Sequence, residues 1–151
     1  MTFQIFLPVV EAAATEAIPI PAKPKPAGGT ETILLVEDEL AVLKATRKFL
    51  ARHGYTVLEA ANGQEALALW ETHRAAVALL LTDLVMPGGW SGQELARRLQ
   101  GEAAGLKVIF ASGYSAEIAG KDFQLHPGEA FIQKPFATDH LLETIRRCLD
   151  A

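Results

Sequence analysis

Residues 79–89 read LLLTDLVMPGG, an apolar run that ends in an acid and is followed, three residues later, by a turn. A short, continuous apolar run is typical of a strand that is buried on both faces. Asp83 stands at the end of that strand, and Pro87 with the two glycines after it predicts a change of direction. The stretch therefore predicts a buried strand with a carboxylate at its carboxyl end.

The segments around this strand repeat an alternation of strand and helix. Apolar runs typical of further strands occur at 33–38, 55–60, 106–112 and 130–135. Apolar residues recur at helical spacing over 39–54, 62–74, 91–101 and 139–151, and weakly over 115–124. Five strands alternating with five helices predict an α/β fold, a doubly wound parallel sheet with helices on both faces.

Single residues mark where these helices begin and end. Asn62, Ser91 and Thr138 are expected as N-caps, because a side-chain oxygen at that position accepts a hydrogen bond from a free backbone amide. Gly54 is expected to end the first helix. Within that helix, Leu40, Leu43, Phe49 and Leu50 recur at helical spacing.

Composition divides the chain near residue 30. Five of the eight prolines lie before it, and proline fixes φ and lacks a backbone donor. Residues 1–29 are therefore predicted to be the end of a preceding domain plus an extended, proline-rich linker. Residues 30–151 are long enough for one domain with its own core.

Charge and hydropathy argue against several classes of protein. The net charge of −4 and the lack of a basic stretch argue against binding to nucleic acid. No apolar run reaches the roughly 18 residues that a membrane helix needs, so no direct membrane contact is expected. The single cysteine, Cys148, excludes an internal disulfide and favours a cytoplasmic location.

Side chains suited to metal and phosphate chemistry follow four of the predicted strands. Glu37 and Asp38 follow the first strand, Asp83 the third, Ser112 the fourth and Lys134 the fifth. The carboxyl ends of parallel strands meet at one edge of the sheet, where ligands bind. Carboxylates 4 Å apart repel by roughly 4 kcal/mol per pair at an effective dielectric near 20. The cluster therefore favours a divalent cation with oxygen ligands, such as Mg²⁺, and a phosphoryl group beside it.

Four motifs carry a resemblance to a known family. They are VEDE at 36–39, TDLVMPGG at 82–89, FASGY at 110–114 and FIQKPF at 131–136. Taken together, in this order and each at a strand end, they make residues 30–151 similar to the receiver domain of two-component response regulators. The resemblance implies a flavodoxin-like sheet in the order 2-1-3-4-5. It also implies transfer of a phosphoryl group from a kinase phosphohistidine to an aspartate.

Matched position by position, the resemblance implies that Asp83 is the phosphoacceptor. Asp38 and Asp83 would bind Mg²⁺ directly, with Mn²⁺ as an alternative ion. Glu37 would act through a water molecule and Val85 through its backbone carbonyl. This domain would catalyse its own phosphorylation and dephosphorylation without being a free-standing enzyme.

The resemblance also implies roles for three residues around the phosphoryl group. Lys134 and Ser112 would hold the product, with Ser112 as the switch hydroxyl. The peptide bond that follows Lys134 is often cis in this family. Phe131 occupies the aromatic switch position, and a plain core role is its alternative.

Two features favour the C-terminal receiver of a hybrid sensor histidine kinase. The loop PGGWSG at 87–92 is one residue longer than the commoner loop, and FQIFLP at 3–8 looks like the last strand of a kinase ATP-binding domain. The expected partners are a histidine kinase core, in cis, and a histidine phosphotransfer protein. A weak homodimer is left open, and the last helix ending near Ala151 argues for phosphorelay rather than DNA binding.

Three alternatives remain beside phosphoryl acceptance. A receiver that docks without phosphorylation would not need the acid set and Lys134. A flavodoxin-like flavin binder would need a phosphate loop after the first strand, where the sequence has EDEL at 37–40. A hydrolase of the aspartyl-phosphate type would want a second acid at position 85, which is Val85.

Overall fold

The computed structural model describes residue 24, residues 26–113 and residues 123–151. Its elements are β1 (Thr32–Val36), α1 (Leu40–Arg52), β2 (Thr56–Ala60), α2 (Gly63–His73), β3 (Val77–Asp83), α3 (Gly92–Glu102), β4 (Lys107–Ser112), β5 (Glu129–Gln133) and α4 (Thr138–Leu149). All strand pairs are parallel and their order is β2-β1-β3-β4-β5, which confirms the predicted topology. The fifth helix expected over 115–124 lies almost wholly outside the described residues.

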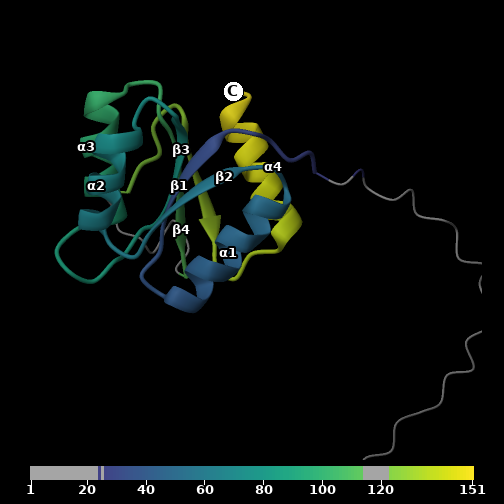
Figure 1. Ribbon diagram of the computed structural model, residues 1–151, viewed down its shortest axis with the longest axis horizontal. Coiled ribbons are helices and arrows are strands. Elements are labelled where there is room, and N and C mark those ends of the chain that lie inside the picture. Colours follow the sequence, from purple (N-terminus) through teal and green to yellow (C-terminus); the bar gives the residue numbers. More distant parts are fainter. Residues whose placement is uncertain (1–23, 25, 114–122) are drawn as a thin grey trace, which may run out of the picture.

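The sheet forms the middle of three layers (Figure 1). Helices α2 and α3 cover one face and α1 and α4 the other, so each central strand sends alternate side chains into two cores. In β1, Leu34 and Val36 join the core under α2 and α3, while Ile33 and Leu35 join the core under α1 and α4. None of the helices within the described residues has the length and apolar character that a membrane crossing requires.

Most of the predicted helix ends are confirmed. Asn62 caps α2 by accepting a hydrogen bond from the Glu65 amide, and Ser91 caps α3 in a capping box with Glu94. Gly54 follows α1 with a φ of +94°, a conformation that favours glycine.

One expected helix end is wrong, and one apolar residue of α1 lies outside the core. Thr138 is already the first residue of α4, and the N-cap is Ala137, which makes no side-chain cap bond. Leu40 is 58% exposed, because it opens α1 directly after the loop that leaves the carboxyl edge of the sheet. Leu40 therefore lies near the carboxyl edge of the sheet rather than in the core.

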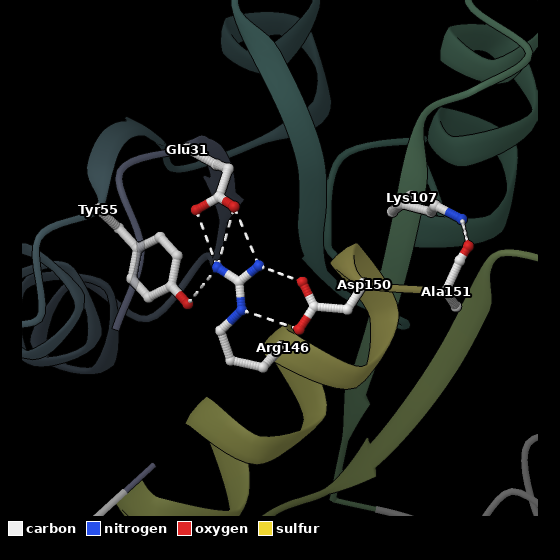
Figure 2. Close-up of polar contacts among 6 residues, drawn as sticks. All are labelled: Glu31, Tyr55, Lys107, Arg146, Asp150 and Ala151. Carbon is white, nitrogen blue, oxygen red and sulfur yellow. Dashed lines mark hydrogen bonds and ion pairs between the residues drawn. The ribbon is translucent and has the colours of Figure 1, made fainter. Parts of the chain in front are cut away.

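Arg146 ties α4 to the opposite, amino edge of the sheet (Figure 2). Its guanidinium donates to both carboxylate oxygens of Glu31 at 2.9–3.0 Å, and to Asp150 one turn further along the helix. It also lies 3.5 Å from the Tyr55 hydroxyl. The residue directly before β1 is thus bonded to α4, the last helix of the domain.

Candidate functional site

Three carboxylates meet at the carboxyl edge of the sheet. Glu37 and Asp38 follow β1, Asp83 ends β3, and the two strands pair so that Val36 lies beside Thr82. One carboxylate oxygen from each acid lies within 4.8 Å of the other two. Glu37 is buried, Asp83 is partly buried and Asp38 is exposed, so the cluster opens to solvent on one side.

Lys134 reaches into this cluster from the end of β5. Its ammonium nitrogen lies 2.5 Å from Oε2 of Glu37 and 3.0 Å from Oδ2 of Asp83. Burial acts to lower the pKa of Lys134, but the hydrogen bonds to these two carboxylates raise it above its ordinary value. The lysine is therefore a fixed cation at neutral pH.

Backbone geometry holds Lys134 in place. Its amide donates to the carbonyl of Ser112 at 2.7 Å, which extends the pairing of β4 and β5 by one residue. The peptide bond between Lys134 and Pro135 is cis, as the resemblance led us to expect.

The acid set has the chemistry of a divalent cation site. Three carboxylates face one ammonium group, so a surplus of negative charge remains at one point of the surface. Their ligand atoms are all oxygens, which suits Mg²⁺ with its remaining positions filled by water and a phosphoryl oxygen. The residues present thus fit the ion that the sequence predicts.

Ser112 and Phe131 lie in different surroundings. Ser112 ends β4, next to Ala111, which pairs with Asp83, and only 2% of its surface is exposed. Phe131 is partly buried against the core under α2 and α3, where its ring packs edge-on against Phe123 at 5.9 Å. The Phe123 ring in turn contacts Phe110 at 5.6 Å. Ser112 thus belongs to the site edge, and Phe131 belongs to an aromatic row beside it.

The loop between β3 and α3 forms the rim of the acid cluster. Val85 is 66% exposed there. Gly88 and Gly89 both have a φ near +95°, which explains why the turn needs two glycines. Gly92 closes the loop, since its amide donates to the Leu84 carbonyl at 3.0 Å and a side chain on it would strike the backbone of Asp83.

One part of this edge was not foreseen from the sequence. A hollow of about 440 Å³ lies beside Asp38, between the start of α2 and the tip of the β3–α3 loop. Asn62, Gly63 and Trp90 line it. The strand-end argument finds residues that follow strands, whereas these residues belong to a helix start and a loop.

Comparison with known proteins agrees with the fold. Residues 33–146 match the response regulator receiver domain family. The chain is similar to the sensor kinase CckA of Brucella abortus, with 36% identity over 99% of its residues. It spans only 16% of the length of that kinase.

Solved structures give the same result. A receiver domain of the hybrid histidine kinase CckA has 36% identity over 78% of this chain and 98% of its own, with a TM-score of 0.66. The response regulator TrrA of Thermotoga maritima, in complex with Mg²⁺-BeF, has 27% identity over 79% of this chain and 99% of its own, with a TM-score of 0.64. The chain belongs to the response regulator receiver domain family.

Proposed function

We propose that this domain accepts a phosphoryl group from a phosphohistidine onto Asp83 in a Mg²⁺-dependent reaction. The observation that carries the proposal is the position of Lys134, whose ammonium nitrogen joins Glu37 to Asp83 at the open edge of the sheet. An ordinary surface lysine would not be partly buried with hydrogen bonds to two carboxylates. The solved Thermotoga relative in complex with Mg²⁺-BeF supports the same assignment.

The chemistry assigned to each residue follows from its charge and place. A carboxylate oxygen of Asp83 attacks phosphorus, an O–P bond forms, and the N–P bond to the donor imidazole breaks, with its electron pair leaving on nitrogen. Lys134 then donates to a phosphoryl oxygen in place of its bond to Asp83, and the Ser112 hydroxyl donates to another. Fixed donors aimed at developing charge are what phosphoryl transfer asks of a protein.

The metal would be held by the acids. Asp38 and Asp83 would be direct ligands, Glu37 would act through water, and the Val85 backbone carbonyl would complete the protein's share; Mn²⁺ would serve as an alternative. Bound there, Mg²⁺ supplies the positive charge that lets an anionic phosphoryl group approach an anionic carboxylate. The buried position of Glu37 keeps it beside Lys134, which fits the indirect role.

The wider setting is also a proposal. Similarity to the sensor kinase covers 99% of this chain, so it extends into residues 1–29, which we assign to the end of a preceding domain and a linker. Residues 30–151 form the receiver. The phosphodonor is a histidine kinase core, in cis, or a histidine phosphotransfer protein, and the location is cytoplasmic.

Incubation with acetyl phosphate and Mg²⁺ tests the proposal. Intact-protein mass spectrometry should show one phosphoryl group on the wild type and none on Asp83→Asn or after chelation with EDTA. Asp150→Asn is the matched control, because Asp150 is an exposed acid at the far edge of the sheet. Equal labelling of wild type and Asp83→Asn, or no labelling of either, would overturn the mechanism and favour a domain that docks without phosphorylation.

A further inference from the structure

Trp90 packs directly on the first residue of α2. A β-carbon added to Gly63 would lie 2.6 Å from Cβ and 2.8 Å from Cγ of Trp90. Both atoms are next to the tryptophan main chain, so they cannot swing away as the end of a flexible side chain can. Any larger residue at position 63 would therefore displace the backbone of the β3–α3 loop.

The same loop is held at both of its ends. The Leu84 amide donates to the Ala111 carbonyl at 2.8 Å, and the Gly92 amide returns to the Leu84 carbonyl at 3.0 Å. Ser91, directly after Trp90, is fixed by its capping box with Glu94. The two ends of the loop are thus pinned to the sheet and to α3.

The stretch between these ends needs a further restraint. Gly88 and Gly89 face open space, since a β-carbon on either would meet nothing within 4 Å. Glycine has the largest backbone freedom to lose, so a tip with two glycines costs the most entropy to order. The contact of Trp90 with Gly63 joins this tip to α2. Both residues line the same hollow as Asp38.

We propose that Trp90, packed on Gly63, is a positioning residue for the metal site. Its contact fixes the position of the β3–α3 loop, and so of the Val85 carbonyl, relative to Asp38 and Asp83. The affinity for the divalent cation therefore depends on this contact. The inference rests on the proposed function, because the Val85 carbonyl is one of the ligands assigned there. Mg²⁺ demands near-octahedral geometry, so a ligand on a loosened loop binds it less well.

Electron paramagnetic resonance of Mn²⁺ measures the affinity without relying on phosphorylation. Trp90→Ala should weaken Mn²⁺ binding about tenfold, the size seen when groups that orient metal ligands are removed. Trp90→Phe, which keeps an aromatic ring on Gly63, should stay much closer to the wild type. Gly63→Ala should weaken binding about as much as Trp90→Ala. Gly101→Ala is the matched control, since Gly101 is also helical but its added β-carbon meets nothing within 4 Å.

The double variant separates a specific contact from general damage. Trp90→Gly removes both Cβ and Cγ, so in the Gly63→Ala/Trp90→Gly double variant the methyl group has room and the two effects should not add. Circular dichroism and urea unfolding without metal establish that each variant is folded. A purely structural role would change the unfolding free energy and leave the Mn²⁺ dissociation constant unmoved.

The outcomes also separate this inference from the proposed function. If the wild type is phosphorylated and binds Mn²⁺ but Trp90→Ala and Gly63→Ala bind it equally well, only the positioning role is wrong. Additive effects of Gly63→Ala and Trp90→Gly would contradict it as well. If the wild type binds no divalent cation, both proposals are wrong.

Discussion

The ammonium nitrogen of Lys134 lies 3.0 Å from a carboxylate oxygen of Asp83, although the two residues are 51 positions apart in the sequence. One ends β3, the other follows β5, and β4 lies between these strands. The contact therefore depends on the parallel sheet, which brings the carboxyl ends of separate strands to one edge. It also means that the lysine neutralises part of the charge that a metal ion would otherwise meet.

Lys134→Met should separate the two roles of this residue. Loss of a donor to the phosphoryl oxygens should slow labelling by acetyl phosphate about a hundredfold. Affinity for Mg²⁺ should rise rather than fall, because a positive charge has left the site. Calorimetric titration with Mg²⁺ and the labelling rate check both, with Lys107→Met as the control at an exposed amine. Loss of Mg²⁺ binding in Lys134→Met would contradict the electrostatic account.

The acid cluster was predictable because residues at the carboxyl ends of neighbouring parallel strands lie close together. Asp83, Glu37 and Lys134 each stand directly at or after an apolar run, and parallel pairing leaves little freedom in where such residues lie. The path of a loop across the neighbouring helix has no comparable sequence signal. The contact of Trp90 with Gly63 therefore appeared only in the structure.

The burial of helix ends was harder to predict for a related reason. Helical periodicity assigns Leu40 and Leu43 to the same face, yet Leu43 is 4% exposed and Leu40 is 58% exposed. Periodicity gives the direction of a side chain but not whether the sheet extends far enough to cover it. The surroundings of Phe131 could not be predicted either. Its ring packs against Phe123, which belongs to the connection between β4 and β5 rather than to a strand or helix of the sheet.

Arg146→Ala should destabilise the domain by about 1–2 kcal/mol, since its paired bonds to Glu31 are charge-assisted and partly shielded from water. Arg146→Lys should recover less than half of this loss, because an ammonium group cannot make the two parallel bonds. Urea denaturation followed by circular dichroism gives the values. Arg147→Ala, at the exposed neighbouring position, should stay within about 0.5 kcal/mol of the wild type. Equal losses at both positions would mean that the network in Figure 2 contributes nothing specific.

The same network should make stability depend on acid pH. Partial burial acts to raise the pKa of Glu31, but a bond from its own backbone amide and the Arg146 guanidinium together lower it. A carboxyl with a lowered folded-state pKa stabilises the fold above its unfolded pKa, near 4.3, and loses that contribution as pH falls through the folded value. The difference in unfolding free energy between wild type and Arg146→Ala should therefore shrink from about pH 6 towards about pH 3. A difference that stays constant over this range would contradict the assignment.

Cys148 should react with thiol reagents only when the domain opens. The side chain lies on the buried face of α4, with its sulfur 3.5 Å from the Gly128 carbonyl oxygen, and burial raises the pKa of the thiol. The reactive thiolate is therefore scarce at neutral pH and shielded by the helix. Ellman's reagent should label the native protein slowly, and in urea the labelled fraction should follow the unfolding curve measured by circular dichroism. Arg146→Ala should speed the labelling, because it loosens the anchor of the same helix, whereas Arg147→Ala should not. Rapid, stoichiometric labelling of the native wild type would show that α4 does not protect this residue.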